Sequence, residues 1–553
     1  MEPGHSLTDR DALWRELATD GARPWDLIVI GGGITGAGIL REAVRRGYRA
    51  LLLEQRDFCW GTSSRSSKLV HGGLRYLAGG QIRLTRHALL ERERLLREAP
   101  YLVRRVPFYY PLRRGVFPPR FAAAVLFWLY DRLAGIDDHR RVEPDELREL
   151  FPGLDPAGLT GAYRYTDAIT DDARLVLRIL HDAVTHGAVV RNYSEVTRLL
   201  REPPAEGPGR VRGVRVEDAG SGAALELEAA VVINATGAWA DRFDSTPPDD
   251  LRIHPQRGSH LVLDAHDFPA PAAIFLHNPE DGRRLFAYPW QGRTVIGTTD
   301  LPHEQGLEAP ACITPAEFEY LLRAAARLYA DRPPTPDDVI ATWSGIRPII
   351  AAGPVGRPSG ASREHRVWSE PGLVSCSGGK LSTFHHMALD VMERAAVFLP
   401  PPRNGHARDS RVLDDTGLRP EDLPGLAPER ATTLIGRFGR AAAALAASAA
   451  GEDLQPLGDS DVCPAELSWS LRREAVVHLD DLLLRRSRLG VVMAKGGAAL
   501  LNEVRDICMR DAGWDDARWS YECERYRDII ARYYPVPEKD VGVQSRKDVG
   551  VHS

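Results

Sequence analysis

The feature that most constrains the fold is a glycine-rich turn between two apolar segments, in "WDLIVIGGGITGAGILREAVRRGYRALLLEQRD", residues 25–57. The apolar residues 27–30 and 50–53 predict two buried strands, and the residues between them predict a turn followed by a helix. Within this unit, glycines stand at the G-x-G-x-x-G spacing. A strand, a glycine turn, a helix and a second strand in this order predict a βαβ unit that binds a dinucleotide.

Each part of this unit has a physical role in binding a pyrophosphate. Gly31 permits the tight turn, Gly33 lets the backbone approach the phosphates, and Gly36 lets the helix pack close to the strand. The helix N-terminus then presents unpaired N–H groups and the positive end of its dipole. Glu54 ends the second strand, where its carboxylate can accept hydrogen bonds from ribose hydroxyls.

Composition limits the class of protein. The chain has 553 residues and a formal charge of −5, so we expect several domains and no nucleic acid partner. None of the six cysteines has CxxC spacing, so we predict no metal site or disulfide framework and a reducing, cytoplasmic compartment. The N-terminus lacks the apolar core of a signal peptide, and no apolar run approaches the ~20 residues of a membrane-spanning helix.

Lysine is rare in this chain. Of its 71 basic side chains, five are lysine and the rest are arginine. Lys68 and Lys380 occur in glycine- and serine-rich surroundings, "SSKLVHGG" and "SGGKLST". Lysine and arginine are not interchangeable where a compact charge must fit. We therefore expect both lysines to lie in crowded loops beside a cofactor or substrate.

Several further motifs occur along the chain: "TSSRSSKLVHGGLRYL", "DDARLVL", "NATGAW", "RGSH", "IGTTD", "SGIRP", "GGKLST" and "DDLLLRRSRLG". Together with the glycine turn, they resemble the FAD-dependent glycerol-3-phosphate dehydrogenase family over roughly residues 24–530. The resemblance implies bound FAD and a two-electron oxidation of sn-glycerol 3-phosphate to dihydroxyacetone phosphate. It also implies that the electrons pass to a membrane quinone.

The resemblance also implies the fold, an α/β flavoprotein. We expect a Rossmann-like FAD-binding domain, an antiparallel β substrate domain and a helical C-terminal domain. The expected boundaries are an N-terminal extension (1–23), FAD-binding segments (24–110, 156–250 and 341–400), a substrate-domain insertion (111–155), the antiparallel substrate domain (251–340), the helical domain (401–534) and a disordered tail (535–553).

The resemblance assigns cofactor contacts to distant parts of the chain. The segment that begins at Thr62 would wrap the pyrophosphate and pass under the flavin ring, with His71 and the glycines after it against the isoalloxazine. The implied cofactor-binding residues are Gly31, Gly33, Thr35, Gly36, Glu54, Gln55, Thr62, Ser63, Ser64, Ser67, Lys68, Leu69, His71, Gly72, Val196, Gly237, Gly345, Gly379, Leu381 and Ser382.

A glycerol phosphate is a small dianion, so its capture needs fixed cations. Arg75 in "GGLRYL" and Arg347 in "GIRPII" have apolar flanks, where an unpaired charge is costly. The planar fork of arginine can bind phosphate in a bidentate way, and Lys380 stands at a predicted helix start whose dipole adds to the field. The implied substrate-binding residues are Arg75, Tyr76, His260, Thr299, Arg347 and Lys380.

Oxidation at C2 also needs a base, because the hydroxyl must lose its proton as the carbonyl forms. Histidine is the usual base near neutral pH, and both His71 and His260 are candidates. The predicted catalytic residues are therefore His71, Arg75, His260, Arg347 and Lys380.

The chain departs from the family after the predicted lysine turn. There the family commonly reads "TTYR", whereas this chain reads "STFH" at residues 382–385. The tyrosine hydroxyl and the arginine charge are lost, which leaves the contacts behind Lys380, the substrate and the acceptor open. The alternatives are an oxidase of the same family that uses oxygen, another hydroxy-acid or amino-acid flavin oxidoreductase, and a flavin-bound but catalytically silent protein at the membrane surface.

Residues 116–135, "VFPPRFAAAVLFWLYDRLAG", predict a short apolar helix with Arg120 and Arg132 at its ends. Ten helical residues rise ~15 Å, about half the thickness of a bilayer core, so the helix cannot span. It fits a core helix and an interfacial helix equally well. The need to reach a quinone in lipid favours a peripheral protein on the inner face of the cell membrane. The oligomeric state, with a homodimer among the options, stays open.

Overall fold

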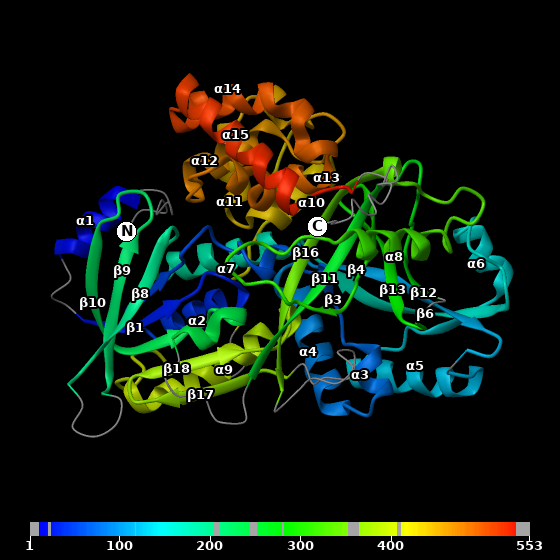
Figure 1. Ribbon diagram of the computed structural model, residues 1–553, viewed down its shortest axis with the longest axis horizontal. Coiled ribbons are helices and arrows are strands. Elements are labelled where there is room, and N and C mark those ends of the chain that lie inside the picture. The colour runs from blue at the N-terminus through cyan, green and yellow to red at the C-terminus, as the bar shows by residue number, and fades with distance from the viewer. Residues whose placement is uncertain are drawn as a thin grey trace, which may run out of the picture.

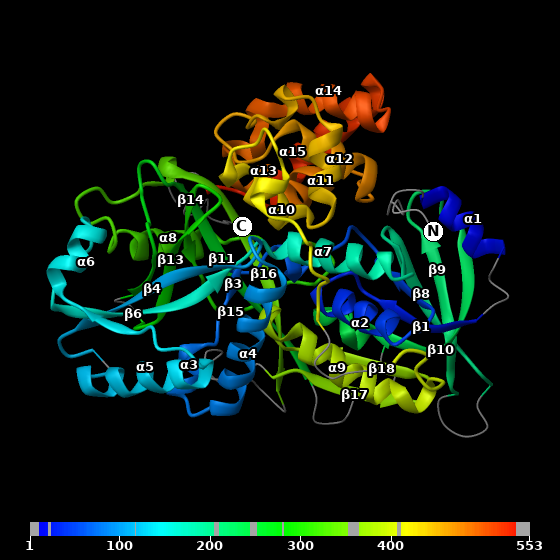
Figure 2. The same ribbon diagram turned by 180° about the vertical axis from the view of Figure 1, so that it is seen from behind.

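The computed structural model describes residues 10–19, 24–116, 118–203, 209–243, 252–278, 281–351, 364–405 and 411–537, without the side chain of Arg75. Two sheets lie next to each other, and a group of helices from the C-terminal part of the chain lies over them (Figure 1). The view from behind shows the same two sheets beneath the C-terminal group of helices (Figure 2).

The first sheet contains the predicted βαβ unit. Its strands lie in the order β17 (Arg366–Glu370), β18 (Leu373–Ser377), β10 (Ala224–Asn234), β1 (Trp25–Ile30), β2 (Ala50–Leu53) and β7 (Val189–Arg191). All of these except β17 run parallel to their neighbours. Strands β8 (Ser194–Arg201) and β9 (Val211–Asp218) continue from β10 as an antiparallel layer.

Alternate residues of β1 pack into two different cores. Leu27 and Val29 share an apolar cluster with the helices α2 (Ile34–Arg45), α7 (Asp172–Thr185) and α9 (Phe384–Ala395). Ile28 and Ile30 share another cluster with the layer of β8, β9 and β10. Both faces of β1 are therefore covered, which explains why the strand is a continuous apolar run.

The second sheet is mostly antiparallel. Its path is β15 (Leu301–Pro302), β11 (Arg252–Asp264), β14 (Arg293–Gly297), β13 (Arg284–Trp290), β12 (Ala273–His277), β4 (Arg104–Arg113), β6 (Leu159–Ile169) and β3 (Leu69–Val70), with β16 (Val339–Ala351) on β11 and β5 (Arg140–Val142) on β6. A turn at Gln291 and Gly292 joins β13 to β14, and both residues have positive φ, 47° and 71°. That geometry suits a two-residue hairpin.

The predicted FAD-binding segments contain parts of the second sheet. Residues 104–110, 159–169 and 341–351, which belong to β4, β6 and β16, pair within that sheet. The physical reason is that residue alternation identifies a strand but not its partner, which long-range pairing decides.

The helical C-terminal part confirms the sequence-based prediction. It contains α10 (Pro428–Phe438), α11 (Ala441–Ser448), α12 (Pro464–Arg473), a π-helical segment (Asp481–Arg486), α13 (Leu489–Val492), α14 (Leu501–Ala512) and α15 (Asp516–Tyr533). The remaining helices are α1 (Arg10–Thr19), α3 (Leu74–Ala78), α4 (Ile82–Glu98), α5 (Arg120–Ala134), α6 (Pro144–Leu150) and α8 (Pro315–Ala325).

The chain thus has the expected α/β class, with a Rossmann-like sheet, an antiparallel sheet and a helical C-terminal part. Most of the predicted tail, from residue 538 onward, lies outside the described residues. In the described part of the chain, no helix combines the length and the apolar character that crossing a membrane requires.

Candidate active site

A cavity of about 830 Å³ lies where the two sheets meet. Its walls include Ile30 and Ala235 at the ends of strands of the first sheet, and Gly258 and Gly345 from β11 and β16 of the second. In parallel α/β sheets, ligands bind at the carboxyl ends of the strands. The position of the cavity therefore matches that of a dinucleotide site.

The glycine turn builds a phosphate cradle on this cavity. Gly31 has φ of +109°, and a Cβ on Gly36 would lie 1.9 Å from the carbonyl oxygen of Gly31. This close contact lets the N-terminus of α2 reach the cavity wall. The first N–H group there, that of Ile34, donates to Ser63 Oγ at 2.9 Å, and Gly33 leaves its backbone open to a ligand.

Glu54 directly follows β2 and lies on the cavity wall. Binding of ribose hydroxyls by its carboxylate requires this position. Its carboxylate accepts hydrogen bonds from the N–H groups of Gly32 at 2.6 Å and Arg56 at 2.9 Å. Burial raises the pKa of Glu54, and the two N–H groups oppose that rise. The arrangement fits the pyrophosphate and ribose of FAD, so the residues present match the implied cofactor.

Most of the predicted cofactor residues line this one cavity, although they come from distant parts of the sequence. Those on the wall are Gly31, Gly33, Thr35, Glu54, Gln55, Thr62, Ser63, Ser67, Leu69, His71, Val196, Gly237, Gly345, Gly379, Leu381 and Ser382. Four predicted residues are not on the wall: Gly36, Ser64, Lys68 and Gly72.

Lys68 lies behind the cavity wall instead of on it. It is 1% exposed, and its Nζ lies 3.1 Å from both carboxylate oxygens of Asp172. The ammonium also lies over the rings of Trp290 and Trp343. Burial, followed by repulsion from Arg488, lowers the pKa of Lys68 to about 8. Its crowding thus arises from a buried ion pair, and its contact with FAD stays a prediction.

Arg347 lines the cavity at its other end. Its guanidinium donates to Thr298 Oγ1 at 3.0 Å and to the Thr299 carbonyl and Asp300 Oδ1, each at 3.3 Å. Gly258 lies opposite Gly345 in the register of β11 and β16. A Cβ on Gly258 would lie 2.4 Å from Arg347 Nη2, so the glycine of "RGSH" makes room for the arginine of "SGIRP".

Lys380 and Tyr76 come together on the same wall, with Lys380 Nζ 3.6 Å from the centre of the Tyr76 ring. Arg75, one residue before Tyr76, lies in α3, but its side chain is outside the described part of the structure. Thr299, predicted to bind substrate, does not line the cavity. Its hydroxyl donates to the buried Glu317 at 2.7 Å, and its neighbour Thr298 takes the place on the wall.

The two candidate bases have different positions. His71 lines the cavity, whereas His260 is 1% exposed and does not. His260 stacks on Trp343 and its Nε2 lies 2.8 Å from Ser67 Oγ, so it reaches the cavity only through Ser67. Burial and the charges of Arg347 and Lys68 hold the pKa of His260 well below its usual range. Of the two histidines, His71 alone thus has direct access to the cavity.

The departure at residues 382–385 has a structural explanation. Phe384 is fully buried and packs against α2, where a Cβ on Gly38 would lie 2.7 Å from its ring. His385 is buried, with Nδ1 3.4 Å from Glu91 Oε2 on α4. Neither residue lines the cavity. Phe384 and His385 therefore act on packing behind Lys380, whereas Ser382 of the same stretch lines the cavity.

Sequence reasoning missed a buried hydrogen-bond network that begins at Gly72, next to His71. The Gly72 N–H donates to Tyr130 Oη at 3.0 Å, and the Tyr130 hydroxyl donates to Asp167 at 2.9 Å. Arg92 also donates to Asp167, at 2.6 Å. Burial raises the pKa of Asp167, and Arg92 opposes that rise. The four residues are far apart in sequence, and only the pairing of "RERLLR" with "YTDAIT" across elements would have indicated the network.

It also missed an apolar arm of the cavity. The arm is formed by aromatic residues of the second sheet and by residues on one face of α5. Neighbouring rings lie 4.6 to 6.4 Å apart between centroids. The arm consists of Phe108, Tyr110, Tyr165, Phe275, Phe286, Ala122, Val125, Leu126 and Leu129.

Comparison with known proteins agrees with this geometry. A family model described as FAD dependent oxidoreductase matches residues 26–385, and one described as the C-terminal domain of alpha-glycerophosphate oxidase matches residues 386–519. The glycerol-3-phosphate dehydrogenase of Mycobacterium leprae (strain TN) is 35% identical over 531 residues, which cover 91% of this chain and 87% of that protein.

Two further similarities extend over nearly the whole chain. Glycerol-3-phosphate dehydrogenase 1 of Mycobacterium tuberculosis (strain ATCC 25618 / H37Rv) is 36% identical over 506 residues, which cover 87% of this chain and 94% of that protein. A solved structure of the glycerol-3-phosphate dehydrogenase from Bacillus halodurans, complexed with FAD, superposes with a TM-score of 0.73 at 25% identity. The superposition covers 95% of this chain and 98% of the Bacillus halodurans chain.

The fold, the cradle and the matched family model define an FAD-dependent oxidoreductase. Within that class, the chain belongs to the glycerol-3-phosphate dehydrogenase family.

The buried, neutral state of His260 predicts a pH dependence of stability. Because the folded-state pKa is depressed, the contribution of His260 is fully present above the unfolded-state pKa of ~6.5 and is lost as pH falls below it. The loss reaches about 1.4 kcal/mol for each further drop of one pH unit, until the folded-state pKa is passed. We expect His260→Gln to flatten the decline of the denaturation midpoint between pH 7.5 and pH 5.5.

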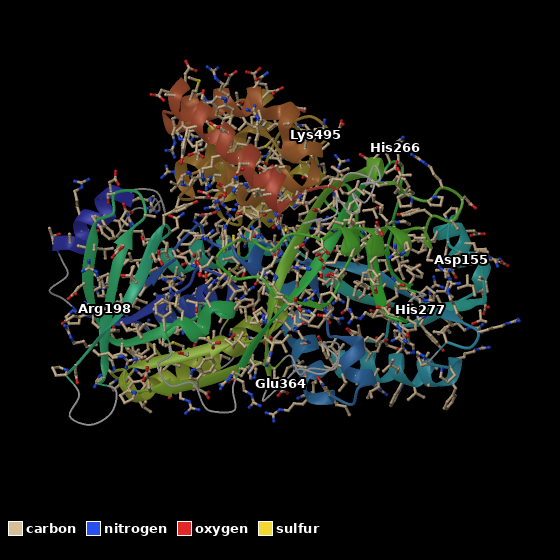
Figure 3. The ribbon with its side chains drawn as sticks, viewed as in Figure 1. Asp155, Arg198, His266, His277, Glu364 and Lys495 are labelled. Carbon is tan, nitrogen blue, oxygen red and sulfur yellow. The ribbon has the colours of Figure 1, made fainter. Side chains whose placement is uncertain are left out.

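The matched control is His266→Gln, since His266 is exposed and lies at the upper edge of the molecule in Figure 3. That variant should follow the wild-type decline. An equal decline in wild type and His260→Gln would mean that folding does not shift the pKa of His260.

Proposed function

We propose that this chain oxidises sn-glycerol 3-phosphate to dihydroxyacetone phosphate and passes the electrons to a quinone in the membrane. The observation that carries the proposal is the placement of two cations, Arg347 and Lys380, in one cavity with the dinucleotide cradle and His71. A substrate with a single carboxylate would need less fixed charge than this.

The cations of the cavity would hold the phosphate of the substrate. Arg347 is anchored on the Thr298 to Asp300 segment, so its positive charge faces a dianion in the cavity with a fixed orientation. Lys380 adds a compact charge that Tyr76 supports from one side. Fixed positive charge also favours loss of the proton from the C2 hydroxyl.

The chain's own residues would handle the proton of the C2 hydroxyl. When bound, FAD supplies the acceptor for the hydride that leaves C2. His71 lies on the cavity wall, where it would take the hydroxyl proton as the C2 carbonyl forms. The hydrogen bond from the Gly72 N–H to Tyr130 holds the backbone next to His71 in place. His260 is hydrogen-bonded to Ser67 and would orient the Ser67 hydroxyl toward the cavity.

The apolar arm supports a quinone as the acceptor. It is continuous with the cofactor cavity and is lined by aromatic and aliphatic side chains, the lining that an apolar ring system prefers. Four of its residues belong to α5, the helix that the sequence predicts to lie at a membrane surface. A quinone could therefore enter from lipid through the arm.

Helix α5 has two different faces, and this supports docking at a membrane surface. Phe127 and Tyr130 are fully buried, whereas Phe121 and Trp128 are 81% and 53% exposed. One face of α5 is thus packed like that of a core helix, and the other face is exposed like that of an interfacial helix. Exposed aromatic side chains with arginines at the helix ends suit the interface between headgroups and acyl chains.

We expect Arg347→Ala to retain bound FAD but to lose about one to two decades of kcat/KM with glycerol 3-phosphate, since a charged contact contributes roughly 1.5–3 kcal/mol. Arg347→Lys should recover part of the loss, because it keeps the charge without the fork. The assay uses a soluble dye acceptor with glycerol 3-phosphate, a 2-hydroxy acid and an amino acid.

The control for this variant is Arg198→Ala, which removes an arginine whose side chain is 65% exposed on β8, at the left edge of Figure 3. It should match the wild type. Unchanged kinetics in Arg347→Ala would remove Arg347 from the site, and turnover of the amino acid or hydroxy acid in place of glycerol 3-phosphate would overturn the proposed substrate.

For membrane docking, we expect Trp128→Glu to reduce flotation of the protein with liposomes that contain anionic lipid, and Phe121→Glu combined with Trp128→Glu to abolish it. A carboxylate on that face would have to enter the interface. Neither residue lines the cavity, so activity with a soluble dye should persist.

Tyr521→Glu is the matched control for docking. Tyr521 is 56% exposed, close to the 53% of Trp128, and belongs to α15, on the opposite side of the molecule from α5 in Figure 1. Loss of flotation in the control as well would indicate a general charge effect. Loss of FAD or of folding in Trp128→Glu would show that α5 serves the core alone.

A further inference from the structure

The C-terminal helical part, residues 411–537, meets the cofactor-binding part through buried charges. The contact falls on the loop at residues 54–68, here called the cofactor loop, which supplies much of the cavity wall from Glu54 to Ser67. On the other side stand Arg485, Arg486 and Arg488 of the motif "DDLLLRRSRLG". Each of these arginines is 1% exposed, and none of the three lines the cavity.

The first contact is centred on Asp57, which is fully buried in the cofactor loop. Arg486 binds its carboxylate with both terminal nitrogens, Nη1 at 2.7 Å and Nη2 at 2.8 Å. Arg485 Nε donates to the same carboxylate at 2.5 Å. Burial alone would raise the pKa of Asp57, but Arg486 and Arg485 hold it below its usual range. The carboxylate is therefore ionised and held in a fixed orientation.

The segment that contains Asp57 is connected to the glycine turn by a backbone hydrogen bond. Two residues after Asp57, the Cys59 N–H donates to the Gly32 carbonyl at 2.9 Å. Asn192, next to β7, donates to Asp57 from the side at 3.0 Å. A change in the position of Asp57 would therefore move the backbone that faces the phosphate cradle.

The second contact is centred on Asp172, the first residue of α7. Arg488 donates to Asp172 Oδ1 at 2.5 Å and to the Ser64 carbonyl in the cofactor loop at 2.9 Å. The same carboxylate accepts from Lys68 Nζ and from the Ser66 hydroxyl. Arg488 thus completes a buried charge cluster. The other members of this cluster hold the backbone on both sides of residues 65–67, which line the cavity.

We propose that Arg485, Arg486 and Arg488 are positioning residues for FAD: the helical C-terminal part fixes the cofactor loop in the conformation that binds the cofactor. Buried carboxylates cost free energy to desolvate and become costly when a partner is removed. The loop therefore adopts its binding conformation only with the three arginines in place. The inference concerns FAD binding alone and does not depend on the proposed substrate or acceptor.

The test measures release of FAD from the full-length holoprotein on dilution, followed by the rise of flavin fluorescence at a temperature below the unfolding transition. Arg486→Gln should increase the dissociation rate constant by about tenfold, because it removes a bidentate, charge-assisted contact. It should also alter the visible circular dichroism of the bound flavin. No substrate or acceptor is present, so the result stands even if the proposed reaction is wrong.

The matched control is Arg437→Gln. Arg437 is also buried and pairs with Glu466 and Asp461, but all three residues lie within the helical part. This variant should lower the unfolding midpoint while the FAD dissociation rate stays within about twofold of the wild type. Equal acceleration of FAD release in both variants would overturn the proposal, because a general loss of stability would then explain the effect.

A second variant keeps the test decisive if Arg486→Gln does not fold. Arg486→Lys retains the charge and removes the planar fork. It should accelerate FAD release by several-fold relative to Arg437→Lys. A dissociation rate equal to that of the wild type would show that the orientation of Asp57 does not control FAD binding.

Discussion

The close packing of α2 against β1 positions the cofactor cradle and the loops around it. With no Cβ on Gly36, the helix lies against the Gly31 carbonyl, and its N-terminus faces the cavity at the end of the sheet. Ser63 then bonds the first free N–H of that helix, and Ala235 packs against Gly31. A phosphate cradle formed in this way needs only backbone N–H groups, so its affinity depends on how closely the surrounding loops are held in place.

Buried charge is the second organising feature. Lys68, Asp172 and Arg488 meet in the interior at the junction of the cofactor loop, α7 and the helical part. Replacing such clusters with apolar residues often stabilises proteins, so the presence of a buried charge cluster is weak evidence that it stabilises the fold. A cluster of this kind instead specifies one arrangement of the elements that share it. Here those elements are the ones that surround the cofactor, which links the helical part to the cofactor site without a contact at the cavity.

The sequence was sufficient for the parts of the site that local patterns encode. The glycine spacing predicted the cradle, and Glu54 at the end of a strand predicted the ribose position. The resemblance placed Arg347, Lys380 and His71 on the cavity. What spacing could not show was side-chain direction: Thr299 and His260 have side chains that face the interior, so Thr298 and Ser67 take the positions on the wall. The sequence also could not predict ion pairs between distant residues, such as that between Asp57 and Arg486.

One cavity joins the flavin cradle, the cations proposed to bind the substrate and the apolar arm proposed to bind a quinone. The most direct measurement is anaerobic stopped-flow spectroscopy of the holoprotein. Glycerol 3-phosphate should bleach the absorbance of the oxidised flavin, and a soluble quinone analogue should restore it much faster than oxygen at equal concentration. Bleaching without faster recovery by the quinone analogue would contradict the role of the arm, and no bleaching with glycerol 3-phosphate would contradict the account of the cavity as a whole.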